Sequence, residues 1–295
     1  MLSDISDYAN WIEIEPIETG LSEDSKFHIT RNNGTELILR VSDISHYKRH
    51  CDSARFSQYI NNRLGLNMNR PIEVAACCSD TLVYTLYTWV DGVEADTKVC
   101  NVHTPEQAKY GEAAGALLRK IHTVTAPADI LPWDEYFSRR LDEMLGMFRY
   151  KVKGSFRGDT QTLEFIEQNR ALLAGRPQTA LHGDFRSGNL IVTKSGELGI
   201  IDFGRWCWGD PYMDFQCVGR SCSAPFARGQ INGYFEGNIP GDFFALMSFY
   251  TAVDSIKRIC LAYSRGREEY AEAIKSAEKT AREYDNFTGH VPNWY

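Results

Sequence analysis

Residues 182–204 read HGDFRSGNLIVTKSGELGIIDFG. Within this stretch, the apolar runs LIV and LGII flank the turn signal KSG at 194–196, and this pattern predicts a short β-hairpin. Paired antiparallel strands lie about 5 Å apart, so a hairpin brings its two open ends together. We therefore expect Asn189 and Asp202, thirteen positions apart in the sequence, to be neighbours in the fold.

The residue types at the open end of this hairpin suit phosphate chemistry. An amide oxygen from Asn189 and a carboxylate from Asp202 are ligands that Mg²⁺ accepts, with waters and phosphate oxygens completing the shell. Asp184 lies five residues before Asn189, on the loop where a base would reach a substrate hydroxyl. Each short motif alone matches many unrelated turns. The three residues in one hairpin frame, however, supply the base and the metal ligands that phosphoryl transfer requires.

Composition narrows the class of protein. The chain has 295 residues, of which 43% are hydrophobic and 24% are charged, which excludes a disordered chain and suits about two globular domains. Thirty-two Lys and Arg against 39 Asp and Glu give a net charge of -7. Proteins that bind phosphate backbones are normally basic, so we expect no nucleic-acid partner.

The cysteines and the first residues indicate the compartment. None of the eight cysteines forms a C-x-x-C pair, and the adjacent Cys77 and Cys78 are poorly placed to bridge two elements. The opening MLSDISDYANW is acidic where a signal peptide would be basic. No apolar run approaches the roughly 18 residues that span a bilayer. We expect a reduced, cytoplasmic protein with no membrane partner.

The first ninety residues have the alternation and turns of a small sheet. An Asn-Asn-Gly turn at 32–34 indicates a hairpin, and a helix is predicted within 44–64 from the spacing of its apolar residues. Strands are predicted at 11–17, 26–31, 36–42, 72–77 and 81–89.

Beyond residue 91 the pattern is mostly helical. Thr104 as N-cap, Pro105 at the first helical position and Gln107 as the closing residue predict a capping box. Further helices are predicted near 133–149, 160–173, 211–222, 241–263 and 267–285. The fold class is therefore α+β, with one domain at 1–90 and another at 91–295.

HGDFRSGN followed by IDFG resembles the catalytic segment of the aminoglycoside phosphotransferase family, whose relatives are choline kinases and, more distantly, protein kinases. The strand-rich part before residue 91, the helical part after it, and the later Gly209-Asp210-Pro211 with Asp214 agree with this family. The resemblance implies a bilobal protein-kinase-like fold, with a small antiparallel-sheet nucleotide-binding lobe at 1–90 and a larger, mainly helical catalytic and substrate-binding lobe at 91–295.

The resemblance also implies roles for single residues. Asp184 would be the catalytic base, and Asn189 and Asp202 would hold Mg²⁺, with ATP or GTP as co-substrate. Three further residues would brace the catalytic loop or organise the helix that follows it: His182, Asp210 and Asp214.

On the nucleotide side, Arg40 in LILRVS matches the cation of the third strand that grips the phosphates. Thr88 and Val90 match the connector whose backbone holds the adenine edge, while Trp89 between them is equally well a core aromatic. Ser22 falls in the loop that would cover the phosphates.

Two departures from the family pattern concern this same region. The helix after the third strand usually supplies a Glu to pair with the cation, yet no Glu occurs between Glu36 and Glu73. Asp52 is the expected substitute. The phosphate-covering loop at 20–25 holds a single glycine and adjacent acids, which make a poor anion nest.

The acceptor is less well defined. Aminoglycosides are polycations, so their site would be lined by carboxylates, for which the candidates are Asp254, Glu268 and the terminal carboxylate of Tyr295. The stretch 265–285 mixes acids with bases, however, as a solvated helix face does.

The leading interpretation is a Mg²⁺-dependent small-molecule kinase that transfers the nucleotide γ-phosphate to a hydroxyl, most naturally of an aminoglycoside-type antibiotic, as in antibiotic resistance. Alternatives are another acceptor (choline, a sugar amine or a macrolide) or a catalytically weak nucleotide-binding regulatory protein. Metal binding by Cys217 and Cys222 is disfavoured, because no His lies between 182 and 290. Both a monomer and a dimer are compatible with the sequence.

Overall fold

The computed structural model describes residues 2–18 and 24–295, which form two compact units. One unit comprises Met1–Glu94 and Asn189–Trp206, and the other comprises Ala95–Gly188 and Cys207–Tyr295. The division therefore differs from the predicted domains 1–90 and 91–295, because the hairpin near residue 195 belongs to the first unit.

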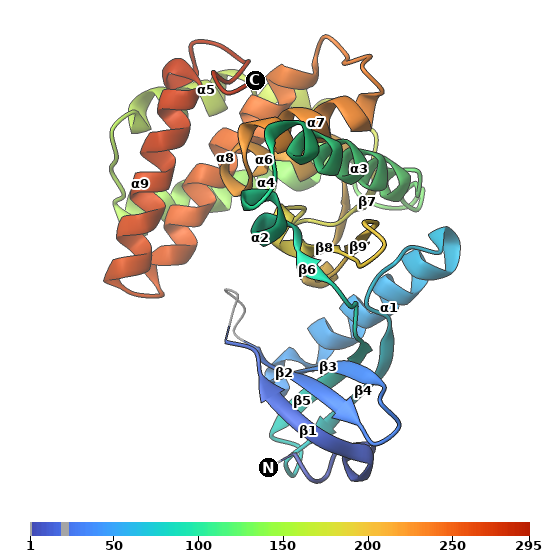
Figure 1. The fold of residues 1–295 in the computed structure, drawn as a ribbon. Coiled ribbons are helices and arrows are strands. Elements are labelled where there is room, and N and C mark those ends of the chain that lie inside the picture. The colour runs from blue at the N-terminus through green and yellow to red at the C-terminus, as the bar shows by residue number, and fades with distance from the viewer. Residues whose placement is uncertain (1, 19–23) are drawn as a thin grey trace. The chain divides into compact units, whose positions relative to one another are not determined.

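The first unit contains a five-stranded sheet in which every neighbouring pair is antiparallel, with the order β1-β2-β3-β5-β4 (Figure 1). Its apolar side chains, such as Ile29, Leu39 and Leu86, are fully buried. The predicted strands are confirmed, with these bounds: β1 (Trp11–Pro16), β2 (Ser25–Arg31), β3 (Glu36–Asp43), β4 (Pro71–Cys77) and β5 (Leu82–Thr88).

The predicted helix of this unit is α1 (Tyr47–Leu64). It buries Phe56 and Ile60, and it ends at Gly65, whose φ of 55° lies in the left-handed region that glycine adopts readily. The Gly65 N–H closes the helix by donating to the Asn61 carbonyl at 2.8 Å.

The predicted hairpin is also present, as β8 (Leu190–Val192) and β9 (Leu198–Ile200). β6 (Val93–Glu94) pairs with β8, and the Ile200 N–H donates to the Asn67 carbonyl at 2.9 Å. These backbone hydrogen bonds to residues before 95 place the hairpin in the first unit. The local sequence pattern of residues 189–206 does not predict these bonds.

The second unit is mainly helical, with one pair of short antiparallel strands, β7 (Thr179–Leu181) and β10 (Cys207–Gly209). The predicted helix at 211–222 is divided into a 3₁₀ turn, Pro211–Phe215, and α6. The helices are α2 (Ala95–Cys100), α3 (Thr104–His122), α4 (Trp133–Gly146), α5 (Asp159–Gln168), α6 (Val218–Ser221), α7 (Ala224–Phe235), α8 (Phe243–Tyr263) and α9 (Arg267–Glu283).

The predicted capping box at the start of α3 does not form. The helix begins at Thr104 with His103 as its N-cap, and no side chain caps it. The Gln107 side chain instead donates to the Val102 carbonyl and accepts from Ser223. A tertiary contact therefore takes the side chain that the capping box would have used.

α2 and α7 were not predicted, and the glycines of α7 explain why it was missed. Glycine lowers helix propensity, but here it permits a close crossing with α3, beside which α7 lies (Figure 1). A Cβ on Gly111 would stand 2.1 Å from the Phe226 carbonyl oxygen, and one on Gly229 would stand 2.2 Å from that of Ala108. Glycine is therefore required at these positions by the close packing of the two helix backbones, and not by its intrinsic helix propensity.

α8 forms the centre of the second unit and is buried on nearly all sides, from Phe243 to Ala262. Trp133 at the start of α4 donates its indole N–H to the Tyr250 hydroxyl at 2.8 Å. Within residues 2–18 and 24–295, no helix combines the length and the apolar character that a membrane span requires.

Candidate active site

The hairpin of the first unit holds the two predicted Mg²⁺ ligands at its open end. The Ile201 N–H donates to the Asn189 carbonyl at 3.0 Å, so Asn189 and the residue before Asp202 are joined through their backbones. Asn189 is buried, whereas the Asp202 side chain is 30% exposed. One amide and one carboxylate from adjacent chain ends are a donor set that fits a hard cation such as Mg²⁺.

Asp202 has an unusual backbone. Its φ of 65° and ψ of 62° lie in the left-handed region, which Asp tolerates better than most residues do. The carboxylate accepts the Gly204 N–H at 3.3 Å and caps the short 3₁₀ turn that follows. Residues in such conformations often occur at functional sites.

Arg40 lies between two carboxylates. Its Nη1 donates to Asp202 at 2.7 Å, and its Nε and Nη2 reach the Oδ2 atom of Asp24 at 3.0 and 2.9 Å. Burial lowers the pKa of Arg40, but Asp202 and Asp24 outweigh it and hold that pKa above its ordinary value. Likewise, burial raises the pKa of Asp24, and Arg40 and Arg49 reverse this effect, so the carboxylate is ionised.

The acid expected to pair with Arg40 was Asp52, and this expectation is wrong. Asp52 forms ion pairs with Lys48 and Arg55 on the exposed side of α1. Asp24, just before β2, takes the place that Asp52 was expected to fill. The aspartate side chain on α1 is used locally, at the i,i+4 and i,i+3 spacings that a helix offers.

The predicted adenine-binding connector follows β5. The Thr88 N–H donates to the Arg70 carbonyl at 2.9 Å, and the Trp89 N–H donates to the Glu36 carbonyl at 3.2 Å. Val90 is buried. The connector backbone is therefore held at defined positions, and its role in nucleotide binding stays a prediction. Ser22 lies outside the described residues.

Asp184 stands in the second unit, on a loop whose backbone is fixed by a buried carboxylate. The N–H groups of His182 and Gly183 both donate to Asp214, at 2.8 Å each. Gly183 has a φ of 78°, which requires glycine at this turn. The Asp184 N–H in turn donates to Nδ1 of His182 at 3.3 Å, so His182 braces the loop. The Asp184 side chain is 24% exposed.

Asp214 itself is held by a residue that the sequence did not indicate. His122, at the end of α3, is hydrogen-bonded through Nε2 to the Asp214 carboxylate at 3.1 Å and through Nδ1 to the Tyr234 hydroxyl at 2.8 Å. All three side chains are buried. No spacing rule links a helix end to a loop ninety residues away, so His122 could not have been found from local pattern.

The three predicted acceptor residues lie on different elements. Asp254 in α8 is buried and accepts from Nη1 of Arg220 at 2.6 Å. Glu268 is exposed in the first turn of α9, and the Tyr295 hydroxyl donates to Asn232 at 3.2 Å. In the described part of the chain, no hydrogen bond or ion pair joins any two of the three.

Three arginines interact with Asp184. Nε of Arg186 lies 3.6 Å from its carboxylate, and Arg220 and Arg258 are close enough to interact with it electrostatically. Burial, and then the neighbouring Arg220, lowers the pKa of Arg258. Its buried Nε has no hydrogen-bond partner among residues 2–18 and 24–295.

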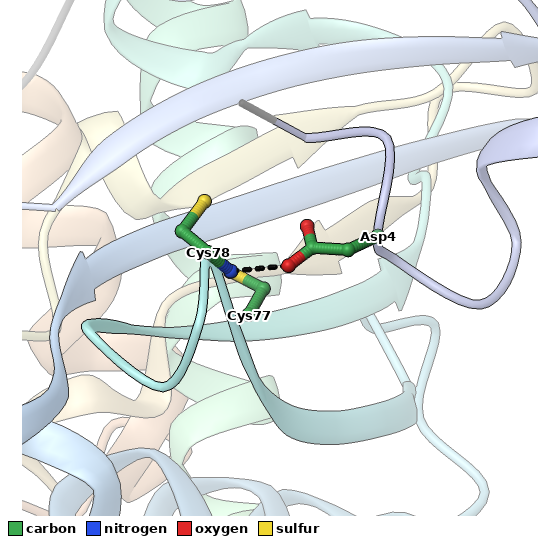
Figure 2. A group of neighbouring side chains, drawn as sticks. All are labelled: Asp4, Cys77 and Cys78. Carbon is green, nitrogen blue, oxygen red and sulfur yellow. Dashed lines mark hydrogen bonds between the residues drawn. The ribbon is translucent and has the colours of Figure 1, made fainter.

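A second group of possible ligands lies in the first unit, away from the hairpin motif. Figure 2 shows Asp4 beside Cys77 and Cys78, with the Cys78 N–H donating to the Asp4 carboxylate. Their ligand atoms lie within 4.8 Å of one another. Burial, with a further contribution from Cys78, raises the pKa of Cys77 to about 12. The thiolate that a metal requires is therefore disfavoured at neutral pH.

Cys217 and Cys222 have other contacts. The Cys217 thiol donates to the Phe185 carbonyl at 3.4 Å, and the Cys222 thiol donates to the Val218 carbonyl at 2.8 Å. Neither belongs to a group of possible metal ligands in the ranges that the structure describes.

The chain resembles known phosphotransferases in sequence and in fold. The sequence pattern of the phosphotransferase enzyme family (APH) matches residues 13–247. No curated protein matches the chain in sequence.

Among solved structures, the chain is similar to an aminoglycoside 2'-phosphotransferase IIIa mutant in complex with GDP, at 12% identity and a TM-score of 0.72, covering 99% of this chain and 98% of that one. It is also similar to a thermostable mutant of aminoglycoside phosphotransferase APH(4)-Ia, at 15% identity and a TM-score of 0.68, covering 94% and 97%. A putative aminoglycoside phosphotransferase from Ralstonia eutropha aligns over 93% of both chains, at 12% identity and a TM-score of 0.68. These likenesses confirm the predicted kinase-like α+β fold. Because the family pattern spans most of the sequence, the chain belongs to the phosphotransferase enzyme family.

Proposed function

We propose that the protein is a Mg²⁺-dependent small-molecule kinase that transfers the γ-phosphoryl group of ATP or GTP to a hydroxyl. The observation that carries this proposal is the hairpin, which holds Asn189 and Asp202 at its open end with Arg40 bonded to Asp202. Asp184 precedes Asn189 by five residues, on a loop whose backbone Asp214 fixes.

Each residue has a defined task in this reaction. Asn189 and Asp202 would hold Mg²⁺, which, when bound, neutralises charge on the nucleotide phosphates. Arg40 would bind phosphate oxygens through its planar guanidinium, which stays charged at any working pH. Asp184 would accept the hydrogen bond of the acceptor hydroxyl, orient it for attack and take its proton as the new P–O bond forms and the bond from the γ-phosphorus to the leaving nucleoside diphosphate breaks.

Aminoglycosides are the first acceptor class to test. Structural neighbours of this chain include aminoglycoside phosphotransferases solved with gentamicin, with hygromycin B and with streptomycin. A cationic acceptor would need exposed carboxylates, and of the predicted candidates Glu268 is exposed. Asp254 is already neutralised by Arg220, so it would reach an acceptor only after releasing that partner.

A specific observation favours a second acceptor class. Arg186 and Arg258 are within electrostatic range of Asp184, whereas the charge of the third nearby arginine, Arg220, is already paired with Asp254. Cations around the base would attract an acceptor that carries a carboxylate or phosphate as well as a hydroxyl. Acceptor screens should therefore pair aminoglycosides, choline and macrolides with anionic hydroxyl compounds.

We place the reaction in the cytoplasm. None of the eight cysteines, all of which lie in the described part of the chain, forms a disulfide, as is usual where the cell keeps thiols reduced.

The deciding experiment is an acceptor screen with the purified full-length chain, ATP or GTP and MgCl₂, with phosphorylated products detected by mass spectrometry. Asp184→Asn should lower turnover roughly 10²- to 10⁴-fold, the usual contribution of a positioned base. Nucleotide affinity and thermal midpoint should stay close to those of the wild type. Asp129→Asn, at an exposed position outside the proposed site, is the matched control.

Two outcomes would contradict the proposal. One is nucleotide binding with no transfer to any acceptor, which would support the non-catalytic regulatory alternative. The other is full activity of Asp184→Asn, which would remove the proposed base from the reaction.

A further inference from the structure

Arg40 has a carboxylate partner that comes from outside helix α1. The helix lacks a Glu, since none occurs between Glu36 and Glu73, and its aspartate, Asp52, pairs with Lys48 and Arg55. The partner is Asp24, which directly precedes β2.

Asp24 is almost completely enclosed, because only 3% of its side chain is exposed. Its Oδ2 atom accepts from Nε of Arg40 at 3.0 Å and lies 2.9 Å from Nη2. Both contacts fall on one edge of the guanidinium, while Nη1 on the other side reaches Asp202 at 2.7 Å. The two nitrogens share one Asp24 oxygen, and together with the Asp202 contact on the opposite side they restrict the orientation of the guanidinium as well as its position.

The other oxygen of Asp24 connects this pair to α1. Oδ1 accepts from Nη2 of Arg49, in the first turn of the helix, and Nε2 of His50 lies 3.9 Å away. The helix thus contributes a cation where an acid is usual, and the carboxylate between the two arginines joins β3 to α1. A buried carboxylate shared by two guanidiniums is costly to disturb, because removing it leaves like charges facing each other.

We propose that Asp24 positions Arg40 for the nucleotide phosphates, in place of the acid that helix α1 lacks. This inference rests on the proposed function, in which Arg40 binds phosphate. Asp24 does not touch the nucleotide in this role. It restricts the orientation of the guanidinium and ties strand β3 to α1 through Arg49.

The opposite role would be competition, in which Asp24 occupies Arg40 and the phosphates must displace it. The two roles predict opposite changes in nucleotide affinity when Asp24 is neutralised. Loss of the Asp24 charge weakens nucleotide binding if Asp24 positions Arg40, and tightens it if Asp24 competes.

The test is calorimetric titration of the full-length chain with ATP and with GTP in the presence of MgCl₂. Asp24→Asn should weaken nucleotide binding at least tenfold, whereas Asp52→Asn, which removes an acid paired on the helix surface, should change it less than twofold. Asp24→Glu keeps the charge and should fall between the two, and it provides the measurement if Asp24→Asn does not fold. A thermal melt of each variant accompanies the titrations.

A double-mutant cycle separates positioning from general stability. If Asp24 acts through Arg40, Asp24→Asn should have no further effect on affinity in the Arg40→Met background, because the group that it positions is gone. A purely structural role would weaken binding equally in both backgrounds and would overturn the inference.

The remaining outcomes are also decisive. Unchanged or tighter binding by Asp24→Asn would overturn the positioning role while leaving the kinase proposal intact. Failure of the wild-type chain to bind any nucleotide would overturn the kinase proposal, and with it the inference. Nucleotide binding without transfer would contradict only the kinase proposal.

Discussion

Two arginines in this protein, one in each unit, lie between two aspartates, yet their surroundings differ. Arg40 bridges Asp24 and Asp202 in the first unit, and its side chain is 14% exposed. Arg176 bridges Asp210 and Asp242 in the second, and its side chain is also 14% exposed. Neither the cation nor its burial therefore distinguishes the two sites.

The difference lies in the aspartates. Asp210 is fully buried and, besides its two-point contact with Arg176, accepts from the Tyr250 hydroxyl at 2.8 Å and the Tyr212 N–H at 3.0 Å. Asp24 is the corresponding buried acid of the Arg40 site, and each site also has an exposed acid, since the Asp202 side chain is 30% exposed and that of Asp242 is 51% exposed. The buried acids differ in their further partners, because Asp210 accepts from neutral groups beside its arginine, whereas Asp24 is shared with a second cation, Arg49. The exposed acid of the Arg40 site, Asp202, also lies at the open end of a hairpin.

The largest effect should come from breaking the Arg176 site. Arg176→Met would leave Asp210 buried without its cation, and the loss of one partner of a buried pair costs about 3–5 kcal/mol. Urea unfolding should show this loss, while the nucleotide affinity of the folded fraction should be unchanged. A loss below about 1 kcal/mol would mean that Asp210 is not held by Arg176, and Arg139→Met on an exposed pair is the control.

Breaking the Arg40 site should affect nucleotide binding more than stability. In Arg40→Met, Asp202 can turn to water and Asp24 keeps Arg49, so the loss of stability should be about 1 kcal/mol or less. Nucleotide affinity should fall roughly 10- to 100-fold, because charge-assisted hydrogen bonds to phosphate are lost. Calorimetry with MgCl₂ measures the affinity. A stability loss that matched that of Arg176→Met would erase the distinction between the two sites.

The smallest effect concerns stability at low pH and involves a histidine beside the Arg40 site. Burial lowers the pKa of His50 to about 4, although the nearby Asp24 opposes this shift. The folded protein therefore binds fewer protons than the unfolded chain between pH 6.5 and 4, so the stabilising contribution of neutral His50 is lost as the pH falls through that window. Arg49, Arg40 and His46 also oppose a positive charge there.

Between pH 7 and pH 5, this loss should be on the order of 1 kcal/mol. His50→Gln should flatten that part of the stability curve, as measured by urea unfolding at each pH. His103→Gln, at the surface, is the control. An unchanged slope in His50→Gln would show that other groups cause the acid sensitivity.

Particular residues show which features of the fold could be predicted from the sequence. Alternating apolar residues and turn signals predicted the strands on either side of Asn33, and the hairpin at 190–200 followed from the same local rules. The adjacency of Asn189 and Asp202 needed only the closing of that hairpin.

The features that were missed are set by contacts between distant segments. Asp24 binds Arg40 across sixteen positions, with no periodicity that could single it out from Asp52. His122 supports Asp214 from the end of a different helix. Helix α7 was not predicted because its glycines lower helix propensity and are needed instead for close packing against the backbone of α3. Residues whose role depends on a partner far along the chain cannot be identified from the sequence pattern around them.

The path of the chain through the hairpin has a practical consequence for dissecting this protein. The chain leaves the first unit at Glu94, returns at Asn189 and leaves again at Trp206. A fragment that ends near residue 91 would therefore lack β8 and β9. It would also leave the Asn67 carbonyl without the hydrogen bond that the Ile200 N–H donates to it. Since Glu94 pairs with Ile191, a short designed turn from residue 94 to residue 189 would reunite the unit in a single uninterrupted polypeptide. This rejoined first unit, rather than a simple truncation, is the form in which nucleotide binding could be studied separately from acceptor binding.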